Sequence, residues 1–299
     1  MSRIHEALKK AEQDRAASQA GAAQPILVTD AQPPAEPPAV PADPGMPSFG
    51  TPLNLDTLLA RSSQLEWKPD LSTMLFLNGG DGARGTEEFR TLRSRLYHAR
   101  EGMPLKKVLV TSALPREGKS FTASNLAQAM VLQHGRRVLL IDADLRAPRL
   151  HTMLGTTPDP GLSDYLQGRG DEFSIMQRGP SENLFFIPSG SAVGDAAELV
   201  GNGRLRVLLQ RVEPLFDWII IDSPPAVPVS DASVLVKDCD GVLMVVRSNS
   251  TPFDMARKAR EQFPDQALLG IVLNGTQAET TPYSHYYYET YQKKGNKKA

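Results

Sequence analysis

The sequence predicts an α/β fold in which helices cover both faces of a mostly parallel β-sheet. The chain has 299 residues, enough for one large α/β domain with extensions. Its hydrophobic content of 40% and charged content of 22% are typical of a folded protein. Short apolar runs alternate with helical segments, and continuous apolar runs are typical of parallel strands that are buried on both faces.

Six apolar runs predict the strands of this sheet. They lie at residues 106–112, 136–144, 184–190, 217–225, 241–247 and 268–275. A helix is expected from about residue 118 to 134, directly after the first run. The earlier segment TEEFRTLRSRLYHAR carries Phe89, Leu92 and Leu96 as an apolar stripe, which predicts a further helix. Strands that alternate with helices favour parallel connections.

The remaining parts of the chain suggest extensions of this domain. Residues 1–18 carry a narrow apolar stripe, which predicts a short amphipathic helix, either solvated or docked to a partner protein. Residues 19–66 are interpreted as a flexible, disordered linker rich in Pro and Ala. The folded domain is predicted at residues 67–280, followed by a polar, mobile tail at residues 281–299.

The composition argues against several classes of function. A net charge of −1 gives no field that would attract nucleic acid, so no nucleic-acid partner is expected. Cys239 is the single cysteine, which rules out an intrachain disulfide and a cysteine-ligated metal site within one chain. The N-terminus lacks the features of a signal peptide, and no stretch reaches the roughly 20 apolar residues that span a bilayer. We expect a cytoplasmic protein that reaches the inner face of the cell membrane through a partner.

A phosphate-binding loop is predicted where the first strand meets the following helix. Residues 113–120 read ALPREGKS, which matches the P-loop pattern G-x-x-x-x-G-K-[ST] except that Ala113 replaces the first glycine. In such a loop backbone N–H groups surround the phosphates, Lys119 supplies positive charge and the Ser120 hydroxyl binds Mg²⁺. The predicted nucleotide-binding residues here are Ala113, Pro115, Arg116, Glu117, Gly118, Lys119, Ser120 and Phe121.

Polar residues at the ends of three other strands are expected to reach the same crevice. Asp142 and Asp144 end one predicted strand, and Asp222 lies at the end of another. Ligands of open parallel sheets bind outside the carboxyl ends of the strands, so these carboxylates converge on the phosphate-binding loop. Carboxylates there can hold Mg²⁺ and can accept a proton from an attacking hydroxyl group. Asn274 ends the last strand at the same edge and is predicted to contact the adenine.

Taken together, these motifs resemble one family. The segments SALPREGKS, LLIDADLRAPRLH and IIIDSPPAVPVSDA, with EEFRTLRSRL before them and a tyrosine-rich end after them, resemble the bacterial tyrosine kinases of capsular and exopolysaccharide synthesis. The match covers about residues 84–291. It implies a P-loop core related to the MinD and ParA ATPases, with ATP and Mg²⁺ as cofactors. The implied activity is autophosphorylation on tyrosine between chains, which regulates polymerisation and export of the polysaccharide.

The resemblance also implies roles for individual residues. Lys119 would be the phosphate lysine, Asp142 and Asp144 the two acids of the second Walker motif, and Asp222 the Walker B acid. Either Asp142 or Asp144 would accept the tyrosine proton, and Arg146 would neutralise charge on the transferring phosphoryl group. The implied Mg²⁺ ligands are Ser120, Asp142 and Asp222. The implied phosphate acceptors are Tyr283, Tyr286, Tyr287, Tyr288 and Tyr291, which are five of the 7 tyrosines in the chain.

Assembly and partners follow from the same resemblance. Glu87, Arg90 and Arg93 match the E-x-x-R-x-x-R pattern that the family associates with ring-like assembly. Considered without the resemblance, the same three residues would be a solvated helix face with internal ion pairs. Further implied partners are a membrane adaptor that regulates polysaccharide chain length and a cognate tyrosine phosphatase.

Two positions depart from the family pattern, and the sequence also leaves one rival function open. Ala113 replaces a glycine, and Arg116 stands where the family more often has glycine, so that Arg116 either accepts a small strain or keeps a negative φ. The rival is a positioning ATPase of the MinD and ParA kind. Those proteins carry an additional lysine early in the P-loop, where this chain has Leu114.

Overall fold

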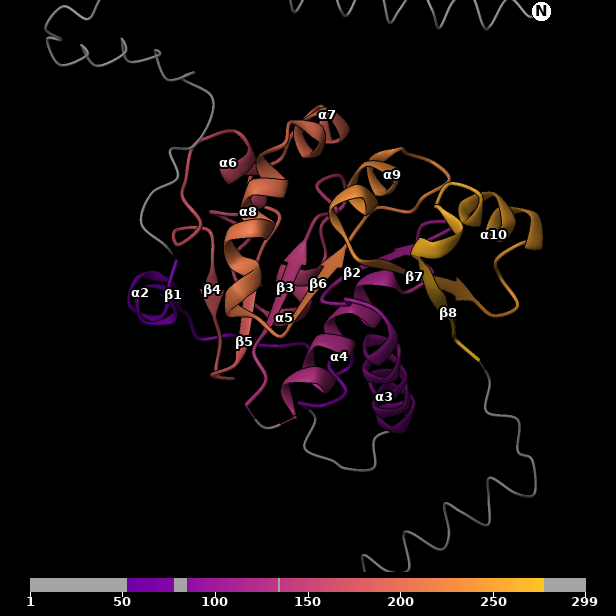
Figure 1. Ribbon diagram of the computed structural model, residues 1–299, viewed down its shortest axis with the longest axis horizontal. Coiled ribbons are helices and arrows are strands. Elements are labelled where there is room, and N and C mark those ends of the chain that lie inside the picture. Colours follow the sequence, from indigo (N-terminus) through magenta and orange to yellow (C-terminus); the bar gives the residue numbers. More distant parts are fainter. Residues whose placement is uncertain (1–52, 78–84, 134, 277–299) are drawn as a thin grey trace, which may run out of the picture. The chain divides into compact units, whose positions relative to one another are not determined.

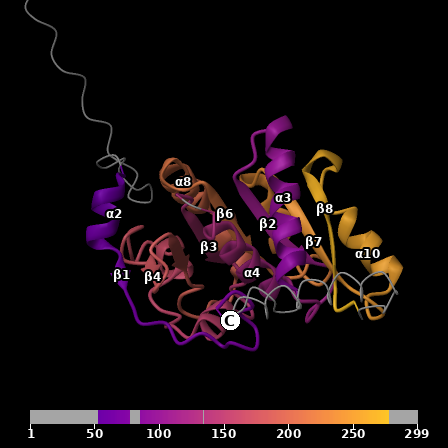
Figure 2. The ribbon, with the colours of Figure 1, turned by 90° about the horizontal axis from the view of Figure 1, so that it is seen from below.

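A single mixed sheet organises the part of the chain that the structure describes. The computed structural model describes residues 53–77, 85–133 and 135–276. The strands are β1 (Ser63–Gln64), β2 (Lys107–Ser112), β3 (Val138–Asp142), β4 (Gln177–Arg178), β5 (Leu184–Ile187), β6 (Trp218–Asp222), β7 (Gly241–Arg247) and β8 (Leu268–Asn274). Within these residues they form an 8-stranded sheet in the order β1-β4-β5-β3-β6-β2-β7-β8 (Figure 1). Figure 2 shows this order from β1, beside α2, to β8, near α10.

The pairing of the strands confirms the prediction of a mostly parallel sheet. Only β4 and β5 pair antiparallel among the described strands, and every other neighbouring pair is parallel. The six predicted apolar runs correspond to β2, β3, β5, β6, β7 and β8. The carboxyl ends of these six strands therefore lie at one edge of the sheet, where the ligand-binding crevice of such folds is found.

Helices cover both faces of the sheet. The α-helices are α2 (Leu55–Arg61), α3 (Thr86–Gly102), α4 (Lys119–Val131), α5 (Leu150–Leu154), α6 (Leu162–Leu166), α7 (Ala196–Gly201), α8 (Arg204–Val212), α9 (Asp231–Leu235) and α10 (Phe253–Arg260), and the short 3₁₀ helices are η1 (Glu213–Leu215), η2 (Val236–Asp238) and η3 (Asp265–Ala267). One core contains side chains of α3, α4 and α5, and the other contains side chains of α2 and of α6 to α10. No helix among the described residues is long and apolar enough to cross a membrane.

Each central strand supplies side chains to both cores. In β3, Val138 and Leu140 pack with α4 on one face, whereas Leu139 and Ile141 pack into the core on the other face. This two-residue alternation is the ordinary geometry of a strand, and it explains why the strand sequence is apolar throughout. All four side chains are fully buried.

The predicted linker is wrong at its C-terminal end. Residues 53–66 are predicted to belong to the linker, but they contain α2 and β1. Asn54 caps α2 by accepting a hydrogen bond from the N–H of Thr57 at 2.7 Å, and Leu58 is fully buried in a core. The folded unit therefore begins by residue 53. The predicted helix at residues 1–18, the linker up to residue 52 and the tail from residue 277 lie outside the described residues.

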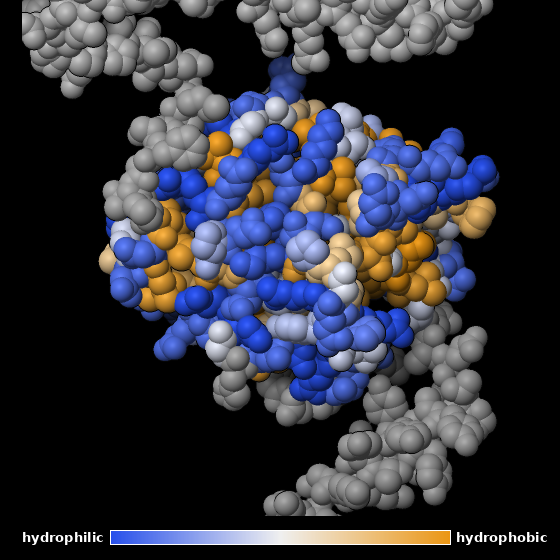
Figure 3. All heavy atoms as spheres, in the orientation of Figure 1, coloured by the Kyte–Doolittle hydropathy of each residue, from blue (hydrophilic) through white to orange (hydrophobic). Residues whose placement is uncertain are grey.

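One edge of the sheet carries exposed apolar side chains. Ile271 and Leu273 of β8 are 58% and 57% exposed, and Phe253 at the start of α10 is 81% exposed. Figure 3 shows apolar residues gathered on the side of the molecule where β8 lies. Within the described ranges, β8 pairs only with β7, so its outer edge is open.

Candidate active site

The P-loop connects β2 to α4 as the sequence predicts. Gly118 has a φ of +98°, immediately before the helix begins at Lys119. A Cβ atom at Gly118 would lie 1.9 Å from Nδ2 of Asn274, so both the backbone conformation and the space require glycine. The first N–H groups of an α-helix have no partner within the helix, and together with the loop they provide a site for anionic phosphates.

Arg116 has a positive φ, which is the strained of the two conformations that the sequence allows. Its φ of +66° lies in the left-handed region, which costs a residue with a Cβ atom on the order of 1 kcal/mol. The carbonyl oxygen of Arg116 accepts a hydrogen bond of 3.1 Å from the guanidinium of Arg247. Arg247 therefore holds the loop backbone at this strained residue.

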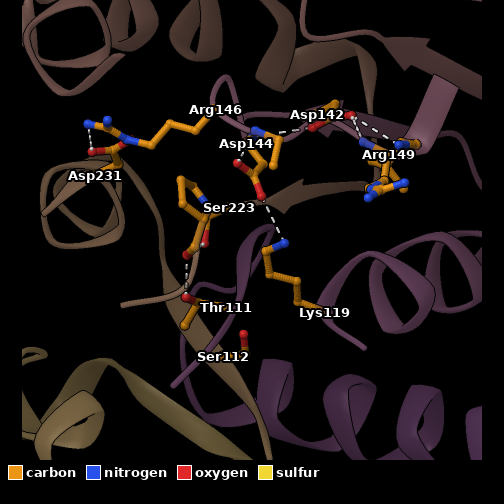
Figure 4. Close-up of polar contacts among 12 residues, drawn as sticks. Thr111, Ser112, Lys119, Asp142, Asp144, Arg146, Arg149, Ser223 and Asp231 are labelled. Carbon is orange, nitrogen blue, oxygen red and sulfur yellow. Dashed lines mark hydrogen bonds and ion pairs between the residues drawn. The ribbon is translucent and has the colours of Figure 1, made fainter. Parts of the chain in front are cut away.

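Lys119 and the aspartates at the end of β3 lie together (Figure 4). The Nζ atom of Lys119 lies 2.8 Å from Oδ2 of Asp144. Asp142 and Asp222 are direct neighbours at the ends of β3 and β6. The carboxylate of Asp142 is fully buried and accepts a hydrogen bond from the N–H of Leu150 at 3.1 Å. Asp144, two residues after the end of β3, lines the pocket, whereas both carboxylate oxygens of Asp142 accept backbone N–H groups.

The pKa values of Asp142 and Asp222 are raised. Burial, with Lys119 acting in the opposite direction and Asp144 in the same direction, raises the pKa of Asp222 to about 7. Burial and the neighbouring Asp222 raise the pKa of Asp142 well above its ordinary value. Burial alone would lower the pKa of Lys119, but the carboxylates of Asp222 and Asp144 outweigh it and raise this pKa. Lys119 therefore remains a cation inside a cluster of acids.

The same cluster fits a divalent cation. Both carboxylate oxygens of Asp222 are buried, and neither has a hydrogen-bond partner of normal geometry among the described residues, although the Ser120 hydroxyl and the N–H of Ser223 lie near enough to lower its pKa. A buried carboxylate without a partner is unfavourable in water-free surroundings, and a bound cation would compensate its charge. Ser120, in the first turn of α4, is largely buried and supplies a hydroxyl oxygen, and oxygen ligands are those that Mg²⁺ prefers. Ser120 and Asp222 therefore fit two of the three predicted Mg²⁺ ligands, whereas the oxygens of Asp142 already accept backbone N–H groups.

Arg146 lies at the pocket but binds a carboxylate that the sequence analysis did not identify. Its Nε and Nη2 atoms donate to the two carboxylate oxygens of Asp231, at 2.8 and 3.0 Å. Figure 4 shows the side chain of Arg146 extending away from Asp144 toward Asp231. Asp231 begins α9, and its side chain is 2% exposed. The bidentate pair therefore fixes the guanidinium at the edge of the pocket.

The site opens into a pocket of about 700 Å³. Its lining includes the P-loop residues Pro115, Arg116, Gly118, Lys119, Ser120 and Phe121, together with Asp144, Arg146, Arg149, Pro224 and Pro225. Asp70 also lines it, because residues 68–77 cross α4 and α5. The N–H of Asp70 donates to the carbonyl of Met153 at 2.9 Å, and the N–H of Leu75 donates to Asn125 at 2.8 Å. No motif in the sequence marks this segment as part of the site.

Two predicted nucleotide-binding residues, Glu117 and Asn274, support the P-loop through side-chain hydrogen bonds. Glu117 is 3% exposed, and its carboxylate accepts a hydrogen bond from the N–H of Leu114 at 2.8 Å. Asn274 donates from Nδ2 to the carbonyl of Glu117 at 2.8 Å. Ala113 is fully buried in a core. The side chain of Leu114 also packs against this core, where the rival ATPases would carry a lysine.

The predicted assembly residues on α3 have different surroundings. Glu87 forms an ion pair with Arg90, one helical turn away, and the side chain of Glu87 is 65% exposed. Arg93 instead donates to the carbonyl of Ala129 on α4 at 2.6 Å. Arg93 therefore joins α3 to α4 within one chain, while Glu87 faces solvent. The five tail tyrosines lie outside the described residues.

Comparisons with known proteins agree with this geometry. The family described as AAA domain matches residues 117–254. The tyrosine-protein kinase YwqD of Bacillus subtilis (strain 168) is 34% identical over 204 residues, which cover 67% of this chain and 86% of YwqD.

Solved structures lead to the same family. The chimerical protein CapA2B2 is 28% identical with a TM-score of 0.64, covering 72% of this chain and 93% of the other. The kinase domain of the Escherichia coli tyrosine kinase ETK is 25% identical with a TM-score of 0.62, covering 73% of this chain and 91% of the other. With the P-loop, the strand-end acids and the parallel sheet in place, the chain belongs to the family of bacterial tyrosine-protein kinases.

Proposed function

We propose that this protein transfers phosphate from ATP to tyrosines in the tail of a neighbouring copy. The observation that carries the proposal is the position of Lys119, which lies 2.8 Å from Asp144 at the start of the P-loop helix. A lysine and a cluster of buried carboxylates beside a phosphate-binding loop are the parts that phosphoryl transfer needs. The similarity to YwqD, whose name is tyrosine-protein kinase, supports the choice of tyrosine as acceptor.

The residues divide between binding and proton transfer. N–H groups of the loop and of the first turn of α4 would bind the phosphates, and Lys119 would neutralise their charge. Ser120 and Asp222 would hold Mg²⁺ directly, and Asp142, beside Asp222 at the end of β3, would add negative charge to the site. When bound, this ion neutralises charge that develops on the phosphate oxygens. Asp142 is fully buried, whereas Asp144 lines the pocket, which favours Asp144 as the base that accepts the tyrosine proton.

Two features at the rim of the pocket fit this reaction. Arg146, anchored by Asp231, would present its remaining donors to the transferring phosphoryl group. Once the phosphates of ATP attract Lys119, Oδ2 of Asp144 loses its lysine partner and becomes available to a tyrosine hydroxyl, while Oδ1 keeps the N–H of Ala147. The Lys119–Asp144 ion pair would thus belong to the nucleotide-free site, and it would separate when ATP binds.

The wider role is a regulator of exopolysaccharide or capsule polymerisation and export. We infer a ring-like homo-oligomer in which Glu87 and Arg90 contribute to the contact between copies, and a position at the inner face of the cell membrane held by an adaptor protein. A tyrosine phosphatase would reverse the modification. Each phosphate adds about 1.5 to 2 negative charges, and repulsion between neighbouring phosphotyrosines would loosen the assembly.

The proposal is tested by incubating the purified protein with ATP and Mg²⁺ and mapping phosphate on the C-terminal peptide. We expect phosphate on one or more of Tyr283, Tyr286, Tyr287, Tyr288 and Tyr291, because these tyrosines are concentrated in a polar tail. The Lys119→Met variant should lose at least 100-fold in rate, roughly the 3 kcal/mol that one well-placed charge provides in a transition state.

Lys237→Met is the matched control. Lys237 is an exposed lysine of η2, so the same change of residue type leaves the P-loop untouched, and the rate should remain that of the wild type. Hydrolysis of ATP with an unmodified tail, even at high protein concentration, would contradict the kinase and favour a nucleotide-switched positioning ATPase of the MinD and ParA kind.

A further inference from the structure

The P-loop is supported from behind by the segment that joins β7 to α10. Thr251 lies in this segment, and its hydroxyl donates a hydrogen bond to the carboxylate of Glu117. The same hydroxyl accepts a hydrogen bond of 3.0 Å from the N–H of Arg247, so both its donor and an acceptor site are used. Thr251 does not line the phosphate pocket. Any effect of Thr251 on the ligand must therefore pass through Glu117.

Glu117 connects this support to the loop itself. One carboxylate oxygen accepts from Thr251, and the other accepts from the N–H of Leu114 at 2.8 Å. Glu117 thus spans the P-loop from its second residue to its fifth. Its side chain is almost completely buried, and a buried carboxylate that loses a donor bears the full cost of desolvation.

Two backbone carbonyls of the loop are held from the same side. Arg247 donates to the carbonyl of Arg116 at 3.1 Å, and Asn274 donates to the carbonyl of Glu117 at 2.8 Å. In a trans peptide unit the carbonyl and the following N–H point in opposite directions. Holding these two carbonyls therefore turns the N–H groups of Glu117 and Gly118 away from the support, toward the side on which phosphates bind.

We propose that Thr251 is a positioning residue for nucleotide binding and that Arg247, Thr251 and Asn274 together form a brace that holds the P-loop ready for phosphate. This brace is needed here because Arg116 keeps a left-handed conformation that a residue with a Cβ atom disfavours. The inference rests on the proposed function only in that the P-loop binds a nucleotide.

The test measures binding of the fluorescent nucleotide MANT-ADP with Mg²⁺, together with the thermal midpoint of the nucleotide-free protein. Thr251→Val replaces the hydroxyl with a methyl group and should raise Kd roughly tenfold, since hydrogen bonds to charged groups stabilise by about that factor or more. Thr251→Ser keeps the hydroxyl and should retain binding within about threefold of the wild type. The thermal midpoint of Thr251→Ser should remain unchanged.

Thr57→Val is the matched control. Thr57 lies on α2, at the far edge of the sheet, and its hydroxyl has no hydrogen-bond partner among the described residues. The Kd of MANT-ADP for Thr57→Val should equal that for the wild type. Wild-type affinity in Thr251→Val, or equal weakening in Thr251→Ser and Thr251→Val, would overturn the brace.

A double-mutant cycle separates positioning from a general loss of stability. Glu117→Gln removes the charge that Thr251 contacts, so Thr251→Val should weaken binding less in the Glu117→Gln background than in the wild type. Additive effects on Kd would contradict the inference. Absence of MANT-ADP binding in the wild type would overturn both the brace and the proposed site, whereas intact binding without tyrosine phosphorylation would overturn the proposed function alone.

Discussion

At the scale of single residues, the buried carboxylate of Asp222 lowers the free energy of unfolding at neutral pH. Its pKa rises from 3.8 to about 7, so the folded protein holds the proton of this carboxyl group more tightly than the unfolded chain does. Between these two values the folded state binds more protons, and the free energy of unfolding therefore decreases as pH rises. Above the folded-state pKa the decrease in the free energy of unfolding is complete, unless a bound cation compensates the charge of the carboxylate.

Replacement of Asp222 by Asn should therefore stabilise the nucleotide-free protein at neutral pH. The amide cannot ionise, and we expect a gain of about 1 to 3 kcal/mol in the free energy of unfolding at pH 7.5, seen as a thermal midpoint several degrees higher. The gain should shrink as pH falls toward 4, where the wild-type carboxyl group is protonated in the folded state. Phosphorylation that depends on Mg²⁺ should be lost at every pH.

Asp231→Asn is the control for this prediction. Asp231 is equally buried, but its carboxylate forms a bidentate pair with Arg146, so the same change should lower the thermal midpoint at pH 7.5. Thermal unfolding in the absence of nucleotide and Mg²⁺, followed from pH 4 to pH 8, measures both variants. A loss of stability in Asp222→Asn at pH 7.5 would show that the carboxylate of Asp222 has a stabilising partner.

At the scale of elements, α2 is part of the fold, although its sequence lies in the predicted linker. Leu58→Ala removes a fully buried side chain, and such a change costs about 2 to 5 kcal/mol when the cavity does not collapse. The matched control is Leu71→Ala, because Leu71 is 48% exposed and its truncation should cost less than about 0.5 kcal/mol. Urea unfolding of both variants measures the difference. Equal free energies of unfolding for Leu58→Ala and Leu71→Ala would show that α2 does not contribute to the folded unit.

The elements that the sequence predicts are those with a continuous pattern of side chains along the chain. β3 and β6 are continuous apolar runs that end in aspartate, so both the strands and the convergence of Asp142 with Asp222 follow from the pattern. β1 and β4 contain two residues each and are polar or charged, which leaves no apolar run to detect. They form because backbone groups pair across the sheet, and pairing of that kind leaves little trace in a sequence.

Interactions between distant segments also escape sequence reasoning. Arg146 is predicted beside the acids of its own motif, yet it binds Asp231, which begins a different helix. Glu117 and Asn274 are predicted to bind nucleotide, and the structure shows that their side chains bond to the loop. A motif identifies which residue types a site needs, whereas the partner that orients each side chain depends on how the loops pack.

At the scale of the whole molecule, the proposed reaction joins the pocket of one chain to the tail of another. The charged residues of α3 have different surroundings, because the side chain of Glu87 is 65% exposed whereas Arg93 bonds to α4. Arg93→Ala should therefore lower the thermal midpoint, since the carbonyl of Ala129 loses its donor. Glu87→Ala should leave the thermal midpoint within about 1 °C, because an exposed ion pair contributes little.

A mixture of two variants tests transfer between chains. One chain carries Lys119→Met with its five tail tyrosines intact, and the other keeps Lys119 but has phenylalanine at those five positions. We expect phosphate on the Lys119→Met chain, at a rate that rises more steeply than the first power of total protein concentration. Glu87→Ala in both chains should slow this transfer several-fold without a change in MANT-ADP affinity. Phosphate that forms only when an active pocket and an intact tail share one chain would contradict transfer between copies, and an unchanged rate in Glu87→Ala would remove α3 from the contact.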